Sequence, residues 1–191
     1  MFQNNFIKKY KKLLDSKTCS DIIKISNSEK HPFIYQEPTT SFGLDRTKKD
    51  CSQICLHFSQ SDLITNRIRI PLRNSLKEYL NKNNSFDIFN SSPILCDDYV
   101  VQKYGPGQGY HAMHCENSGT KFSSNRVLAW MIYLNDVTEG GQTYFPYQNK
   151  KIKPKTGDAY IWPAYFTHPH KGIVSKTQSK YIVTGWVIYS D

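Results

Sequence analysis

The chain has 191 residues, of which 38% are hydrophobic and 21% charged. This size and composition are typical of one soluble domain and argue against disorder. No stretch approaches the ~18 consecutive apolar residues of a membrane span, and the first residues lack the apolar core of a signal peptide. We therefore expect a cytoplasmic protein without a membrane partner.

The formal net charge of +9 allows an acidic partner such as nucleic acid. A solvated basic surface is the favoured interpretation, because the lysines lie in small scattered groups without interleaved aromatic residues. The five cysteines are an odd set without a Cys-x-x-Cys motif, which favours reduced thiols over a disulfide framework or a zinc knuckle.

The first predicted elements are a short strand around Phe6 to Tyr10 and a helix over residues 15–28. Asp15 and Ser16 are candidate N-caps of this helix, and Cys19 and Ile22 fall on one of its faces. A polar loop without periodicity follows over residues 37–50, and its length suggests a surface or substrate-lining role.

A second helix is predicted over residues 61–80. Leucines and isoleucines recur there every four residues, at Ile64, Ile68, Leu72, Leu76 and Leu80. Pro71 falls inside the pattern, so we expect it to kink or divide this helix.

Beyond Phe86 the pattern changes to short runs rich in β-branched and aromatic residues, separated by turn residues. The runs span residues 99–104, 126–134, 143–147, 158–166, 172–175 and 180–189. This spacing predicts an antiparallel sandwich or barrel. We therefore expect an α+β, mainly β fold in one domain over residues 1–191, with a helical support region at 1–85 packed on a β core at 86–191.

A cluster of potential ligands lies in "YGPGQGYHAMHCENSG", residues 104–119. If residues 110–116 form an extended strand, the side chains of His114 and Glu116 leave the same face. A histidine and a carboxylate, completed by one more histidine, make the facial triad that binds non-heme Fe(II). An exposed polar pair is the ordinary alternative for an isolated His-x-Glu.

Two downstream histidines, His168 and His170, could supply the third ligand, and strand alternation does not separate them because both leave the same face. With these pieces, residues 98–188 resemble the Fe(II)- and 2-oxoglutarate-dependent dioxygenases of the prolyl 4-hydroxylase type. The matching pieces, in the family's order, are Tyr104, the His-x-carboxylate pair, "YLNDVTEGGQTYFP" (133–146), "IKPKTGDAYIWP" (152–163), His170 and Lys180.

The resemblance implies a double-stranded β-helix, or jelly-roll, catalytic core. It also implies that His114, Glu116 and His170 hold the iron, and it favours His170 over His168 because Gly172 and Lys180 follow at the family's spacing. Tyr104 and Tyr133 would line the 2-oxoglutarate pocket. Lys180 would bind the distal carboxylate, and alternation lets this lysine point into the barrel together with Ile182, Thr184 and Trp186.

One position departs from the family, since most members have aspartate where this chain has Glu116; we still expect it to bind iron. Arg126 matches a position beside the substrate in related enzymes, although a surface arginine is an equal interpretation. Cys115 should face away from the metal, which argues against a thiolate ligand. The three tryptophans are interpreted as barrel core.

The implied activity is hydroxylation of a peptide or protein substrate, with peptidyl proline the favoured target, and release of succinate and CO2. Fe(II), 2-oxoglutarate and O2 are the expected cofactors, with ascorbate as a candidate reductant. The alternatives are the same chemistry on a free amino acid, another side chain or a nucleobase, and a non-catalytic jelly-roll binding module. The charge of +9 keeps a nucleic-acid partner as a less favoured interpretation.

Overall fold

A large antiparallel sheet forms the centre of the molecule. The structure, a computed structural model, describes residues 5–27, 35–36, 43–59, 63–83 and 93–189. The sheet has seven strands in the order β1-β10-β7-β12-β5-β4-β2. Their bounds are β1 Lys8–Tyr10, β2 Tyr35–Gln36, β4 Ser52–His57, β5 Ile94–Tyr104, β7 Arg126–Tyr133, β10 Ala159–Pro163 and β12 Lys180–Ile188.

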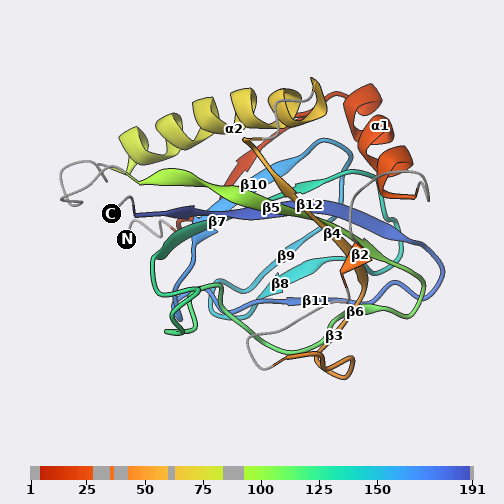
Figure 1. Cartoon of the computed structure of the whole chain (residues 1–191). Coiled ribbons are helices and arrows are strands. Elements are labelled where there is room, and N and C mark those ends of the chain that lie inside the picture. The colour runs from red at the N-terminus through yellow and green to blue at the C-terminus, as the bar shows by residue number, and fades with distance from the viewer. Residues whose placement is uncertain (1–4, 28–34, 37–42, 60–62, 84–92, 190–191) are drawn as a thin grey trace.

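Two smaller sheets lie against one face of the large sheet, and both helices cover the other face (Figure 1). One small sheet has the order β11-β8-β9, with β8 Thr143–Phe145, β9 Lys150–Ile152 and β11 Lys171–Gly172. The other pairs β3 Lys49–Asp50 with β6 Gly109–Tyr110. The predicted mainly β, jelly-roll architecture is confirmed.

Helix α1, Ser16–Ser26, begins where the sequence predicts. The side chain of Asp15 accepts a hydrogen bond from the Thr18 backbone N–H at 2.7 Å, as expected of an N-cap. Cys19 and Ile22 are buried on its inner face.

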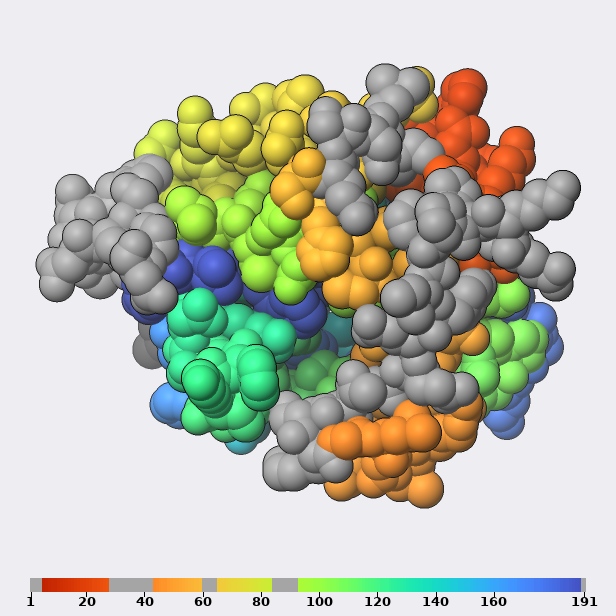
Figure 2. All heavy atoms as spheres, viewed as in Figure 1, coloured from red at the N-terminus to blue at the C-terminus, as the bar shows by residue number. Residues whose placement is uncertain are grey.

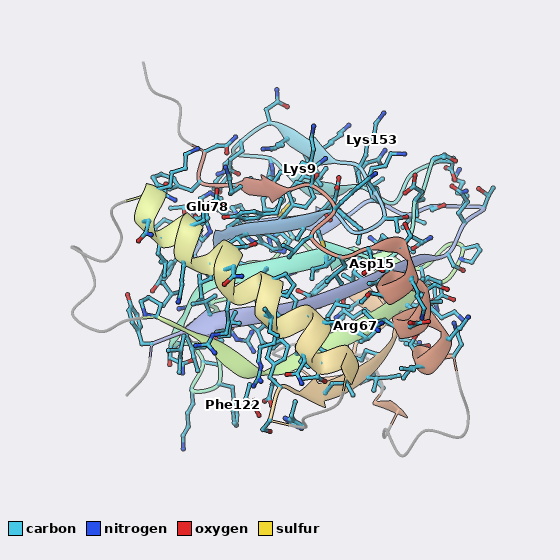
Figure 3. All side chains as sticks on the ribbon, turned by 90° about the horizontal axis from the view of Figure 1, so that it is seen from above. Lys9, Asp15, Arg67, Glu78, Phe122 and Lys153 are labelled. Atoms are coloured by element: carbon cyan, nitrogen blue, oxygen red, sulfur yellow. The ribbon has the colours of Figure 1, made fainter. Side chains whose placement is uncertain are left out.

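Helix α2, Leu63–Lys82, is one helix with Pro71 inside it, so of the two predicted effects, a kink or a division, the division is wrong. An internal proline costs about 3 kcal/mol. Burial of the apolar face, with Ile68, Leu72, Leu76 and Leu80 at most 5% exposed, outweighs that cost. Seen from the helix side, α2 crosses the strands at a slant (Figure 3). Within the described part of the chain, neither helix combines the length and apolar composition needed to cross a bilayer.

Two hydrophobic cores lie on opposite faces of the large sheet, one beneath the helices and one between the sheets. Strand β7 contributes to both cores: Trp130 belongs to the first and Tyr133 to the second. Gly185 is required beside Trp130, because an added Cβ would lie 2.5 Å from the indole ring. Trp130 and Trp162 are core residues as predicted, whereas Trp186 is only partly buried and lines a cavity described below.

The N-terminal part supplies strands to the large sheet as well as helices, since β1 pairs with β10 and β4 pairs with β5. Strands β4 and β9 were not predicted. The predicted strand at 172–175 ends at Gly172, and the predicted loop at 37–50 is described only from residue 43. The division at residue 85 stays a prediction.

Candidate metal centre

The site begins where the chain leaves the small sheets. The assumption of a strand over residues 110–116 is wrong, because strand β6 ends at Tyr110. His114 instead forms an isolated antiparallel bridge with His170, through backbone hydrogen bonds of 3.0 and 2.8 Å. This bridge brings together two histidines that are far apart in the sequence.

Three potential ligands converge here. His114 Nε2 lies 3.7 Å from Glu116 Oε1, and His170 Nε2 lies 3.4 Å from the same oxygen. The candidate ligand atoms of all three residues lie within 4.8 Å of one another. Two imidazoles and one carboxylate could hold a divalent transition metal on one face and leave its other positions open.

Both imidazole rings are oriented by their second nitrogen. His114 Nδ1 lies 3.1 Å from the Ala112 carbonyl oxygen, and His170 Nδ1 lies 3.1 Å from the His168 carbonyl oxygen. If each Nδ1–H donates to its carbonyl oxygen, each Nε2 is unprotonated and its lone pair points into the cluster. This is the tautomer that a metal ligand requires.

Glu116 is held by residues that do not belong to the triad. Trp186 Nε1 donates to Glu116 Oε2 at 2.7 Å, and Arg126 Nη1 donates to the Glu116 carbonyl oxygen at 3.1 Å. The Arg126 guanidinium also lies 3.7 Å from the centre of the Trp186 ring. The glutamate therefore presents Oε1 to the histidines while Oε2 stays with Trp186.

The protonation of the cluster suits metal binding. Burial opposes ionisation of Glu116, but its interactions with the adjacent His170 and His114 rings and the hydrogen bond from Trp186 hold its pKa well below the usual range. Burial, reinforced by His170, lowers the pKa of His114 to about 3. Near neutral pH, Glu116 is a carboxylate and His114 a neutral imidazole.

His168 lies outside the cluster. Its Nε2 lies 2.9 Å from the Asn5 carbonyl oxygen and its Nδ1 lies 2.9 Å from Thr167 Oγ1. Cys115 donates from Sγ to the Asn117 carbonyl oxygen at 3.2 Å and is not part of the cluster either.

A cavity of about 710 Å³ adjoins the cluster. Figure 2 shows the surface hollowed between the lobe that holds residues 117–125 and the segment 43–59. The cavity is lined by alternate residues of β12, namely Lys180, Ile182, Thr184 and Trp186, as strand alternation predicted. Its volume suits a small co-substrate and one residue of a substrate.

Lys180 is a buried cation, only 6% exposed. Its Nζ donates to the Gly141 carbonyl oxygen at 3.2 Å and lies 4.7 Å from the centre of the Tyr104 ring. Burial lowers its pKa to about 8, so it remains mostly charged at pH 7. No ion pair to Lys180 occurs among the residues that the structure describes, so this ammonium could receive the carboxylate of a bound molecule.

The two tyrosines predicted beside the co-substrate differ. Tyr104 lines the cavity, with its hydroxyl donating to Gln102 Oε1 at 2.8 Å. Tyr133 is fully buried outside the cavity lining, and its hydroxyl lies 2.7 Å from Thr143 Oγ1. Thr143 does line the cavity, so Tyr133 lies behind the wall and not in it.

Several cavity residues were not predicted from the sequence. Tyr110 stacks on His114 with ring centroids 3.5 Å apart. Lys49 comes from the predicted loop at 37–50 and Gln53 from β4, which was not predicted, and both line the cavity together with Gln102. The one sequence signal for this part of the cavity wall was the polar loop at 37–50, for which a surface or substrate-lining role was predicted.

Comparisons with known proteins agree with this geometry. The sequence model of the 2OG-Fe(II) oxygenase superfamily matches residues 99–188. A protein of Acanthamoeba polyphaga mimivirus named "Putative prolyl 4-hydroxylase" is 32% identical over 140 residues, which are 60% of this chain and 58% of that protein. The chain thus spans less than two thirds of this relative's length.

Solved structures share the fold. The viral collagen prolyl hydroxylase of Paramecium Bursaria Chlorella virus-1, solved with 2OG, superposes with a TM-score of 0.71 at 22% identity and covers 97% of both chains. The prolyl hydroxylase solved with a hypoxia inducible factor peptide fragment, from Trichoplax adhaerens, gives a TM-score of 0.72 at 16% identity over 97% of this chain and 84% of that one.

Proposed function

On the premise that residues 99–188 form a 2OG-Fe(II) oxygenase domain of the prolyl 4-hydroxylase type, we propose that this protein hydroxylates peptidyl proline. The reaction would use Fe(II), 2-oxoglutarate and O2 and release succinate and CO2. Ascorbate as a reductant stays a prediction. The five cysteines, which are free thiols, support the further proposal of a cytoplasmic location.

The observation that carries the proposal is the convergence of His114, Glu116 and His170 beside a cavity that contains a buried lysine. The donor set fits Fe(II), because two neutral imidazoles and one carboxylate are its usual protein ligands in this class of site. The Nδ1 contacts of both histidines fit the same assignment, since they aim the Nε2 lone pairs at a common point.

When bound, Fe(II) and 2-oxoglutarate supply the oxidising chemistry, and the protein supplies position and shielding. Lys180 would bind the distal carboxylate of 2-oxoglutarate, and the Tyr104 ring beneath it would hold the ammonium in place. Trp186 and Arg126 keep Glu116 in its ligand orientation. Phe145 and Trp162, which pack on the His170 ring, keep water from the other side of this ligand.

Peptidyl proline is favoured as the target because relatives and structural neighbours are named as prolyl hydroxylases and one was solved with a peptide. The same site could act on a free amino acid, another side chain or a nucleobase. A non-catalytic binding module is disfavoured by Lys180, because an unpaired buried ammonium is costly unless it binds an anion.

The experiment is succinate formation from 2-oxoglutarate by the purified protein with Fe(II) in air, compared with the His170→Ala variant. We expect metal-dependent succinate from the unaltered protein and none from the variant. A protein that binds metal and peptide but forms no succinate would favour the binding module.

A further inference from the structure

Lys49 is a second buried lysine in the cavity wall. It belongs to β3 and is 6% exposed. Its Nζ donates to Gln53 Oε1 at 2.8 Å and lies 5.4 Å from the centre of the Tyr110 ring. Among the described residues, no carboxylate forms an ion pair with it. Burial lowers its pKa, and the charges of Cys51 and Glu116 only partly oppose this shift.

Lys49 and Lys180 stand at opposite ends of a chain of polar side chains. Lys49 and Gln102 Nε2 both donate to Gln53 Oε1, Tyr104 donates to Gln102, and Lys180 lies over the Tyr104 ring. Lys49 is at the end near the metal centre, since it faces Tyr110, which stacks on His114. The two lysines are therefore positioned for different anions.

The charge around the metal centre is unbalanced. Lys49, Lys180 and Arg126 line the cavity there with Glu116 as their carboxylate, while Asp98 at the rim is paired with His57. Fe(II) and a 2-oxoglutarate dianion cancel each other, so their binding would leave this excess of positive charge unchanged. Lys180 would be satisfied by the co-substrate and Arg126 lies 3.9 Å from Glu116. Within the described ranges, Lys49 has no carboxylate at ion-pair distance, and its Nζ donates only to Gln53 Oε1.

We propose that Lys49 binds a carboxylate of the substrate beside the reacting position and so selects anionic substrates. The carboxylate could belong to an acidic side chain next to the target residue or to a free C-terminus. This inference rests on the proposed function. A carboxylate at Lys49 gains a charge-assisted hydrogen bond in a water-poor site, where such a bond discriminates strongly against a neutral amide.

The test uses paired probes that differ only in one charge. The first pair is Ac-Gly-Glu-Pro-Ser-Gly-NH2 and its glutamine counterpart, and the second is Ac-Gly-Ser-Pro with a free carboxylate or an amide. Each probe is titrated by calorimetry into the full chain loaded with Mn(II) and 2-oxoglutarate. This measurement of binding does not depend on turnover. The first pair reports an acidic side chain, and the second reports a free C-terminus.

We expect the protein to bind the acidic member of at least one pair about ten- to a hundredfold more tightly than the neutral member. Lys49→Met should reduce this ratio to near one without changing the affinity for 2-oxoglutarate. Gln53→Glu should reduce it as well, because the new carboxylate would pair with Lys49 internally. Lys48→Met, which removes an exposed lysine at the neighbouring position, should leave the ratio intact.

Equal binding of both members by the unaltered protein, no binding of any probe, or a ratio that survives Lys49→Met would overturn the inference. A weaker affinity for 2-oxoglutarate in Lys49→Met would also overturn it, by assigning Lys49 to the co-substrate. In each case the protein still binds metal and 2-oxoglutarate, so the oxygenase part of the proposed function stands; the absence of binding by every probe would count against the peptide substrate as well. If it binds neither, the proposed function fails and this inference fails with it.

Discussion

Replacing Lys180 with methionine should stabilise the protein without its co-substrate while weakening the binding of 2-oxoglutarate. The folded protein holds the pKa of Lys180 at about 8, against an ordinary value of 10.5. At ~1.4 kcal/mol for each unit between these values, burial of the charge costs roughly 3 kcal/mol of folding free energy at pH 7. Loss of the hydrogen bond to Gly141 offsets roughly 1 kcal/mol of the gain.

The net gain of about 2 kcal/mol corresponds to a rise in Tm of about 4–8 °C for a chain of this size. The gain should depend on pH in a defined direction. Because the folded pKa is lowered, the cost is complete below pH 8 and disappears as the pH rises from about 8 toward 10.5. At high pH only the lost hydrogen bond to Gly141 remains, so the variant should become less stable than the unaltered protein by roughly 1 kcal/mol.

The Lys180→Met variant should bind the co-substrate more weakly. The charge-assisted contact between Lys180 and the distal carboxylate is worth roughly 1.5–3 kcal/mol, so the Kd for 2-oxoglutarate should rise about ten- to a hundredfold. Affinity for Mn(II) alone should change little. Lys176→Met, at an exposed position in the preceding loop, is the control for loss of one positive charge.

Thermal unfolding at several pH values and calorimetric titration with 2-oxoglutarate give the two readouts. A variant that is less stable than the unaltered protein at pH 7 would refute the assignment of Lys180 as an unsatisfied buried cation. An unchanged Kd for 2-oxoglutarate would move the carboxylate anchor elsewhere, with Arg126 the first candidate.

Three further predictions concern the metal centre. His114→Ala and His170→Ala should each abolish metal binding measured by Co(II) absorbance, whereas His168→Ala should retain it because His168 contacts Asn5 and Thr167; metal loss in the last variant would reverse the choice of ligand. Glu116→Asp should keep measurable turnover, since it retains a carboxylate at the ligand position, and complete inactivity would contradict this. Trp186→Phe removes the hydrogen bond to Glu116 and should weaken metal affinity about tenfold or more; unchanged affinity would show that the indole does not orient the carboxylate.

Periodicity and composition predicted both helices and most of the strands but failed at β4 and β9. Strands β5, β7, β10 and β12 have apolar residues pointing toward two cores, so their composition alone marks them. Strand β9 has the sequence Lys-Lys-Ile, with Lys151 exposed and Lys150 half-buried, so its sequence resembles a charged surface segment. The helix through Pro71 was uncertain in sequence because the burial that supports it is tertiary.

The triad could be predicted from the family's motif order, but its supporting residues could not. Lys49 and Gln53 reach the cavity through the pairing of β3 with β6 and of β4 with β5, and no local pattern indicates those pairings. Trp186 was expected in the core because tryptophan is usually buried, whereas its indole N–H serves the Glu116 carboxylate. Tyr133 was expected to line the 2-oxoglutarate pocket, but Thr143 separates it from the cavity.

The most direct measurement of the central claim is a single reaction in which succinate and hydroxylated peptide are quantified together. It contains the protein, Fe(II), 2-oxoglutarate, O2 and a proline-containing peptide. We predict equimolar succinate and peptide that has gained one oxygen atom on proline, both absent in the His170→Ala variant, with free proline a poor substitute. Efficient oxidation of free proline or a nucleoside while every peptide is inert would contradict the polypeptide substrate, and the absence of succinate under all conditions would contradict the oxygenase itself.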